Sequence, residues 1–284
     1  MIKPRADCLL CSFDRSQMFT NCPIDEILSA VRIAYDAFDK TQYKIKCRPT
    51  DDLIHLLKTV LENNIFEFNG NLHQQCLGSA IGACCAPEGC NILMYQIMKD
   101  ILSKFANKDK IFYYVRYMDD GFIIYNGDQH ELIDFFEMAN NHHKSLKFTY
   151  EISNAETTFL DVHLFKGKRF LNENILDMRT YFKHTNTFLY LHYSSYNIRH
   201  VFAGLIKGEV MRHIRNTNNK DNLQLLLTQF KLNLINRGYK ETEINSCFTE
   251  ALKKDRLSLL RKDNKKRKKE IPLVLSTKYN PCIR

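Results

Sequence analysis

The sequence predicts an α+β fold, in which a mostly antiparallel β-sheet backed by helices precedes an all-helical region. Two observations lead to this prediction. Up to about residue 185, short strand-like runs alternate with helical segments. From Tyr196 onward, apolar residues recur every three or four positions, which is the spacing of amphipathic helices. We therefore expect two domains, residues 1–185 and residues 186–284, with a bundle of short helices in the second.

In the first half of the chain, each expected element is marked by a local pattern. Strands are short apolar runs, helices begin at a proline or with acidic residues in the first turn, and Asn69-Gly70 is typical of a hairpin turn. These patterns predict strands over Asp7–Phe13, Ile65–Phe68 and Leu72–Cys76, and helices that begin at Pro23, after Thr50 and at Pro87.

In the second half, the pair Asp120-Gly121 lies between two apolar, β-prone runs. Such a pair predicts a hairpin turn, because the turn needs a positive φ that glycine adopts without strain. Alternation and helical spacing mark the remaining elements. Together they predict strands over Ile111–Tyr117, Phe122–Tyr125, Leu146–Ile152, Phe159–Val162 and Arg179–Lys183, and a helix around Glu131–Met138.

Three aspartates form the strongest chemical pattern. The predicted hairpin would place Asp119 and Asp120 at its tip, and Asp14 follows the first predicted strand. Carboxylates that converge from separate strand ends are the ligands that two hard divalent cations require, since Mg²⁺ takes oxygen ligands and leaves room for substrate phosphates. The alternative interpretation is a solvated turn without a metal.

Composition supports a folded intracellular protein. Of 284 residues, 44% are hydrophobic and 12% aromatic, which is enough for a substantial core. No run reaches the roughly 18 uninterrupted apolar residues of a membrane span, and the N-terminus lacks a signal-peptide pattern. Ten cysteines without a secretory signal are typical of reduced thiols. We therefore expect an intracellular protein that does not engage a membrane.

Positive charge is concentrated near the C-terminus. The formal net charge is +9, and residues 253–269 contain ten Lys or Arg and two Asp, a net of +8, which leaves +1 for the rest of the chain. A run such as Lys265–Lys269 suits contact with phosphates or nuclear import. A solvated helix end is the alternative. Because the basic run suits nuclear import, we expect the protein to be nuclear.

The tetrapeptide Tyr117-Met118-Asp119-Asp120 resembles the active-site box of reverse transcriptases. Two further blocks, Ser12–Pro23 and Gln75–Pro87, resemble the corresponding motifs of reverse transcriptases from Penelope-like retroelements. The resemblance extends from about Ala6 to Asn280. It implies a polymerase palm followed by a helical thumb, which in the animal relatives resembles a helix-turn-helix region.

The resemblance also implies roles for individual residues. Asp14, Asp119 and Asp120 would be the catalytic metal ligands, holding two Mg²⁺ ions roughly 3.5–4 Å apart, with Mn²⁺ as an alternative. Phe19 would be a steric gate, whose ring rejects the 2′-hydroxyl of a ribonucleotide by collision. The remaining implied contacts to the nucleotide, template or primer terminus are Gln75, Gly78, Gly82, Tyr117 and Met118.

Two assignments stay open within this resemblance. A general acid for the pyrophosphate could be Lys144 or Lys147, because the spacing does not single one out. Asp161 could be taken for a further catalytic acid, but we interpret it as structural, because the three earlier carboxylates already serve two metals.

The implied reaction is RNA-templated DNA synthesis, with an RNA template, a DNA primer and deoxynucleoside triphosphates as partners. Members of the family have a fingers region before the first carboxylate motif, and many carry a nuclease domain after the thumb. Neither has a counterpart in these 284 residues, so we expect a portion of a larger polymerase. The alternatives are an inactive retroelement remnant that binds nucleic acid through its helical region, and a helix-turn-helix DNA-binding protein with a vestigial palm.

Overall fold

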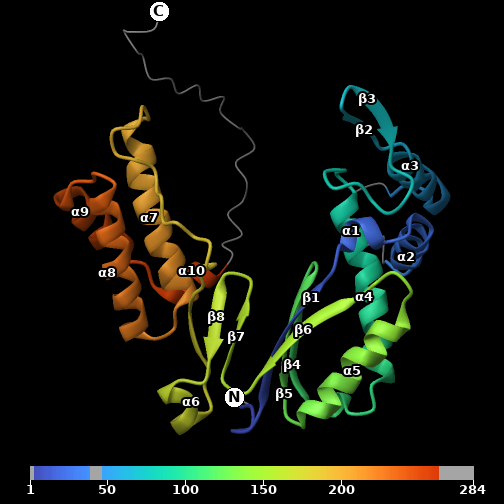
Figure 1. The fold of residues 1–284 in the computed structure, drawn as a ribbon, viewed down its shortest axis with the longest axis horizontal. Coiled ribbons are helices and arrows are strands. Elements are labelled where there is room, and N and C mark those ends of the chain that lie inside the picture. The colour runs from blue at the N-terminus through green and yellow to red at the C-terminus, as the bar shows by residue number, and fades with distance from the viewer. Residues whose placement is uncertain (1–2, 39–46, 262–284) are drawn as a thin grey trace, which may run out of the picture. The chain divides into compact units, whose positions relative to one another are not determined.

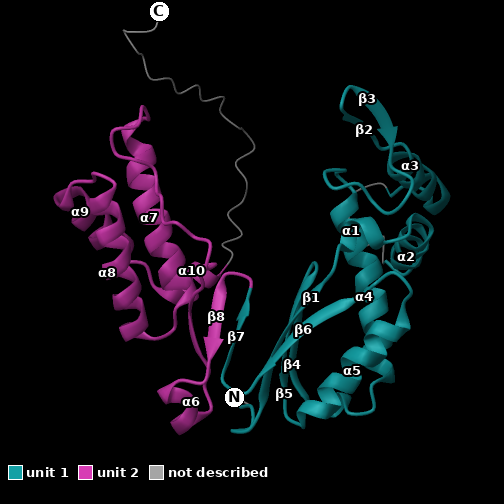
Figure 2. Cartoon of the chain, viewed as in Figure 1, with its two compact units in different colours: residues 1–159 teal, residues 160–284 magenta. Residues whose placement is uncertain are grey.

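The computed structural model describes residues 3–38 and 47–261. The chain separates into two compact units, residues 1–159 and residues 160–284 (Figure 2). The predicted domain boundary after residue 185 stays a prediction. The basic run Lys265–Lys269 lies outside the described residues. None of the described helices is both long and apolar enough to cross a membrane.

Unit 1 contains a four-stranded antiparallel sheet with strand order β4-β5-β1-β6 (Figure 1). A separate hairpin, β2–β3, follows α3. The elements of unit 1 are β1 (Leu9–Arg15), α1 (Met18–Asn21), α2 (Ile24–Asp36), α3 (Thr50–Glu62), β2 (Ile65–Phe68), β3 (Asn71–Gln74), α4 (Ala86–Lys104), the 3₁₀ helix η2 (Lys108–Lys110), β4 (Ile111–Tyr117), β5 (Asp120–Tyr125), α5 (Gln129–His142), β6 (Phe148–Ser153) and β7 (Glu156–Phe159).

Helices cover one face of the four-stranded sheet, and the core of unit 1 lies between them (Figure 1). Because side chains alternate along a strand, Cys11 and Phe13 of β1 point into this core together with Ile123 of β5. The intervening residues of β1, including Asp14, therefore belong to the opposite face. This alternation decides which side chains are available for a site.

Unit 2 contains the β8–β9 antiparallel pair and a group of helices. Its elements are β8 (Val162–Phe165), α6 (Lys168–Glu173), β9 (Asp177–Thr180), α7 (Arg199–Asn216), α8 (Lys220–Asn236), α9 (Glu241–Ala251) and α10 (Arg256–Leu260). Apolar residues of α7, α8 and α9 form one core, with Ile206, Phe230 and Ile244 almost fully buried. The antiparallel sheet backed by helices and the helical C-terminal region confirm the predicted fold class.

Several predicted boundaries are wrong. The first strand extends to Arg15, so Asp14 lies inside the strand and not after it. Phe159–Val162 is not one strand, because Leu160 adopts φ 52° and ends the extended run. The last strand is Asp177–Thr180 and ends before the predicted Tyr181–Lys183. Only the break at Leu160 comes from a single backbone angle, which the apolar pattern does not reveal.

A buried histidine lies in the core of unit 2. His213 of α7 is 1% exposed, and its Nδ1 lies 3.0 Å from Oγ1 of Thr180. Burial, together with the nearby Arg212, lowers the pKa of His213 to about 4. The Glu209 carboxylate, 3.7 Å from Nε2, opposes this shift. Burial outweighs it, because the ring also packs edge-on against Phe182 and Phe230.

We expect unit 2 to lose stability in mild acid through His213. The pKa is about 4 in the folded chain and about 6.5 when unfolded, so the contribution is fully present above pH 6.5 and is lost as the pH falls toward 4. The expected loss is about 3 kcal/mol. Urea unfolding followed between pH 7 and pH 4 measures it. His213→Gln should flatten this pH dependence, and an unchanged dependence would contradict the assignment.

Candidate active site

The register of the sheet brings the three aspartates to one edge of unit 1. Phe13 of β1 pairs with Gly121 of β5, so the next residue, Asp14, lies opposite Asp120. Asp119 occupies the two-residue loop between Tyr117 and Asp120, the last pair of the β4–β5 hairpin. Because opposed residues share a face, Asp14 and Asp120 both lie on the face away from the helices.

Gly121 has a different role from the predicted one. Its φ is not positive, and it lies in the strand rather than the turn. A Cβ at this position would meet Cζ of the Phe13 ring at 1.9 Å. The glycine is therefore required because the ring of Phe13 lies directly over its backbone. This contact fixes the β1–β5 register and, with it, the opposition of Asp14 and Asp120.

The left-handed residue of the turn is Met118, with φ 55°. A bulky residue in this region is strained by about 1–3 kcal/mol, and such strain often marks a functional site. Arg116 holds the turn: its Nη1 donates to the Met118 carbonyl at 2.5 Å, and its Nη2 donates to the Asn91 carbonyl of α4 at 3.3 Å. Sequence reasoning missed Arg116, although a single cation in an aromatic strand was a signal.

The three carboxylates offer oxygen ligands, which suit a divalent cation, and they lie at the same end of the sheet. Their side chains do not converge: within the described ranges, no three His, Cys, Asp or Glu side chains lie close enough to hold one metal ion. The backbone therefore positions the aspartates, and binding a metal would require their side chains to turn toward it. The sequence predicted these residues, and the metal itself stays a prediction.

The loop after β3 holds the predicted nucleotide-contacting residues. Gly78 adopts φ 67°, and a Cβ there would meet the Thr20 carbonyl oxygen at 2.2 Å, so its backbone packs on α1. Gly82 adopts φ 106° and its Cβ would meet nothing. Gln75 and Gly82 line a pocket of about 560 Å³, together with residues of α1 and β2 such as Thr20 and Phe66. Gly78 thus packs closely on the backbone of α1, a Cβ at Gly82 would meet open space, and the side-chain amide of Gln75 donates to the Leu77 carbonyl at 2.7 Å.

The aromatic residues of the prediction differ in burial. Phe19 is half-buried against the core of unit 1, and its carbonyl accepts a hydrogen bond from the Ser79 backbone N–H at 2.7 Å. Tyr117 is 63% exposed, and Met118 packs partly on the core. This hydrogen bond ties the Phe19 segment to the loop that contains Gly78 and Gly82, the glycine loop.

Arg15, the neighbour of Asp14, points the opposite way and is 1% exposed. Its Nη1 donates to Sγ of Cys22 at 3.3 Å, and its Nε and Nη2 have no partner among the described atoms. A hydrogen bond with Cys90, together with the Arg15 guanidinium, lowers the pKa of the Cys22 thiol. A thiolate at Cys22 would compensate the buried cation, which otherwise costs several kcal/mol.

Two residues whose roles were left open, Lys147 and Asp161, form contacts with nearby residues. Nζ of Lys147, the residue before β6, donates to the Asn140 carbonyl of α5 at 2.5 Å. Asp161 belongs to unit 2, where its carboxylate accepts a hydrogen bond from Nε of Arg212 at 3.3 Å. The interpretation of Asp161 as a structural residue stays a prediction.

The family model of the animal helix-turn-helix domain matches residues 189–249. No curated protein matches the sequence. Among solved structures, the chain is similar to telomerase from Candida albicans in complex with a fragment of telomeric RNA, with a TM-score of 0.56 and 10% identity over 88% of this chain and 40% of that chain.

Two further structures show the same fold. Apo telomerase from Candida tropicalis has a TM-score of 0.53 and 10% identity, over 89% of this chain and 42% of that one. The BmCPV RNA-dependent RNA polymerase at its elongation state has a TM-score of 0.52 and 10% identity, over 81% of this chain and 21% of that one. The chain therefore has a polymerase-like fold and spans less than half of each of these proteins.

Gly121→Ala tests the contact that sets the aspartate register. We expect it to destabilise unit 1 by about 1–3 kcal/mol, the range for overpacking a core, because the methyl group would overlap the Phe13 ring. Urea unfolding measures the change. The cost should be smaller in a Phe13→Leu background. Gly204→Ala is the control, since a Cβ there meets nothing within 4 Å. Equal costs in both backgrounds would contradict the proposed overlap.

Proposed function

We propose that this chain is the palm and thumb portion of an RNA-directed DNA polymerase, a reverse transcriptase of the Penelope-like type, that acts in the nucleus. The observation that carries the proposal is the β1–β5 register, which opposes Asp14 to Asp120 beside the strained Met118 turn. The polymerase-like fold and the Tyr117–Asp120 motif support it. Residues 1–185 would form the palm and residues 186–284 the thumb.

In this proposal, the 3′-hydroxyl of a DNA primer on an RNA template attacks the α-phosphate of a deoxynucleoside triphosphate, and pyrophosphate leaves. Asp14, Asp119 and Asp120 would hold two Mg²⁺ ions, or Mn²⁺, which when bound would activate the hydroxyl and stabilise the charge on the leaving group. Arg116 keeps the turn that carries Asp119 in place. Tyr117 and Met118 would support the primer terminus.

The pocket beside the glycine loop is the proposed position of a base. Ile65, Phe66 and Ile81 give it an apolar wall, and Gln75 supplies an amide. Phe19 lies next to the lining residue Thr20 in α1 and packs partly on the core, and its role as the gate for the sugar of a nucleotide is part of this proposal.

The second candidate function is an inactive retroelement remnant that binds nucleic acid through its helical region. Two observations favour it: the three carboxylates do not converge within the described part of the chain, and residues 189–249 match the animal helix-turn-helix domain. Primer extension distinguishes the two candidates, because a remnant would bind nucleic acid without extending a primer.

Asp120→Asn should lower primer extension with Mg²⁺ by roughly 10²–10³-fold, the range for removing one group that stabilises transition-state charge. Binding of Mn²⁺, followed by electron paramagnetic resonance, should weaken in parallel. Asp134→Asn, which removes an exposed carboxylate of α5, is the matched control and should change neither. Extension that persists in an Asp119→Asn/Asp120→Asn double variant would refute the metal assignment.

Phe19→Val should let ribonucleotides enter. Removing the ring should reduce discrimination against the 2′-hydroxyl by about 10–100-fold, measured as the ratio of kcat/KM for deoxynucleotides and ribonucleotides. Because Phe19 also packs on the core, some loss of stability is expected. Phe19→Tyr keeps the ring and should keep the selectivity. A Val variant that is less stable but equally selective would return Phe19 to a purely structural role.

A further inference from the structure

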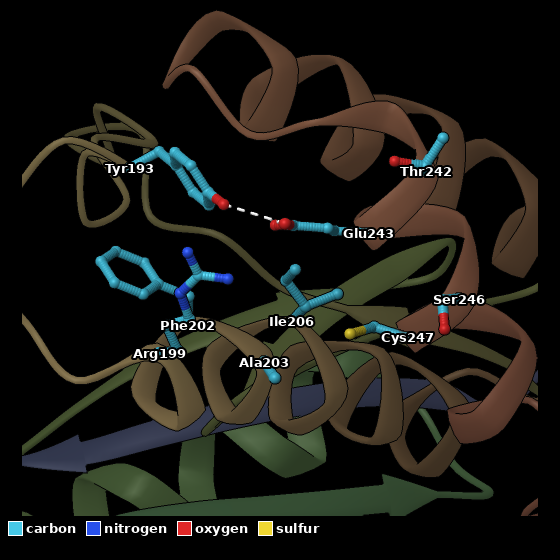
Figure 3. A pocket seen from close by; sticks show the side chains of 9 residues that line it. All are labelled: Tyr193, Arg199, Phe202, Ala203, Ile206, Thr242, Glu243, Ser246 and Cys247. Carbon is cyan, nitrogen blue, oxygen red and sulfur yellow. Dashed lines mark hydrogen bonds between the residues drawn. The ribbon is translucent and has the colours of Figure 1, made fainter.

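Unit 2 contains a pocket of about 350 Å³ between the first turns of α7 and α9, which lies within the range of small-ligand sites (Figure 3). Its floor is apolar, formed by Phe202 and Ile206 of α7 and Cys247 of α9, all at least nine-tenths buried. None of the residues predicted for the candidate active site lines it. The pocket is therefore a second site with its own chemistry.

An aromatic pair forms one wall of the pocket. The rings of Tyr193 and Phe202 lie 5.4 Å apart at 51°, and both contact Tyr239, at 5.3 and 5.9 Å. Tyr239 is only 4% exposed, so this cluster is held by the core. Because the two rings are inclined at 51°, a flat ligand can stack on the face of only one of them. Tyr193 is the more accessible, since it is half-buried whereas Phe202 is 8% exposed.

Two opposite charges occupy the rim of the pocket. Arg199 forms no hydrogen bond or ion pair with a described residue, so its guanidinium is available as a donor fork. Oε1 of Glu243 accepts a hydrogen bond from the Tyr193 hydroxyl at 2.9 Å, which orients the carboxylate (Figure 3). This same bond raises the pKa of Tyr193 and keeps the hydroxyl protonated. Oε2 then remains as an oriented acceptor.

The apolar floor, the aromatic rings and the two opposite charges together restrict the kind of ligand that the pocket can bind. A simple anion would meet the Glu243 carboxylate, and a simple cation would meet the Arg199 guanidinium. A ligand that satisfies both needs an acceptor edge, a donor edge and a flat apolar body. Among common biological rings, guanine has all three: O6 and N7 are acceptors that suit arginine, and N1–H and N2–H₂ are donors that suit a carboxylate.

We propose that this pocket binds one unpaired guanine base of a single-stranded nucleic acid. Glu243 would accept from N1–H with Oε2 and from N2–H₂ with the second lone pair of Oε1, Arg199 would donate to O6 and N7, and the base would stack on the ring of Tyr193. Adenine is disfavoured, because its N1 lone pair would face the carboxylate. Uracil lacks the N7 acceptor. The hydroxyl of Tyr193 orients Glu243, while its ring contacts the base.

The inference rests on the proposed function only for the presence of single-stranded nucleic acid, and binding can be measured without catalysis. Fluorescence anisotropy of the full chain would compare labelled oligouridine strands that carry one central guanine, inosine or adenine. We expect guanine to bind more tightly than adenine by roughly 5- to 150-fold, the range that one bidentate pair provides. Inosine, which lacks the N2 amino group, should lie between them.

Glu243→Gln should remove the guanine preference, because an amide donor would then face N1–H. Glu241→Gln is the matched control: it removes the same charge two residues earlier, from a side chain that pairs with Lys231 outside the pocket. Tyr193→Phe should reduce the preference without abolishing binding. Circular dichroism checks the fold of each variant.

Equal binding of the guanine and adenine strands, or a preference that survives Glu243→Gln, would overturn the inference. Asp120→Asn separates it from the proposed function. If that variant keeps the guanine preference while primer extension is lost, both proposals stand. If no chain extends a primer but the preference follows Glu243, the polymerase proposal fails and the base pocket remains.

Discussion

The contact between the Phe13 ring and the backbone of Gly121 is the constraint on which the candidate active site depends. The ring occupies the space that any Cβ at position 121 would need. The contact fixes how β1 pairs with β5 and therefore which residue faces Asp14. A shift of one residue would move Asp120 to the opposite face of the sheet. The packing of the core thus determines the position of the carboxylates on the other side of the strands.

In unit 1, the residues that fix the backbone differ from those proposed to bind a ligand. Arg116 holds the turn, Gly121 sets the register and Gly78 lets the glycine loop approach α1, each through contacts within unit 1. Asp14 is exposed, and Gln75 and Gly82 line a pocket. In unit 2, the Tyr193–Glu243 bond has the same kind of role, because it prepares an acceptor before any ligand arrives. In both units, the positions of the proposed ligand-contacting side chains depend on contacts with neighbouring residues.

The sequence was sufficient to predict most helix starts and the hairpin, because these depend on residues close together in the chain. Thr50 with two following acids marks the start of α3, and Tyr117 and Asp120 flank the predicted turn. The sequence could not show why position 121 requires a glycine, because the ring that lies over it belongs to Phe13, more than one hundred residues earlier. The pocket of unit 2 also combines residues of separate helices, which periodicity alone cannot join.

The two close-packed glycines of unit 1 differ in what they touch. Gly121 lies against a side chain, so a smaller residue at position 13 can make room for a larger one at position 121. Gly78 lies against the backbone of Thr20, which every residue shares, so no exchange at position 20 can make such room. Related sequences would therefore vary positions 13 and 121 in concert, whereas position 78 has no compensating partner and evolution can only retain its glycine.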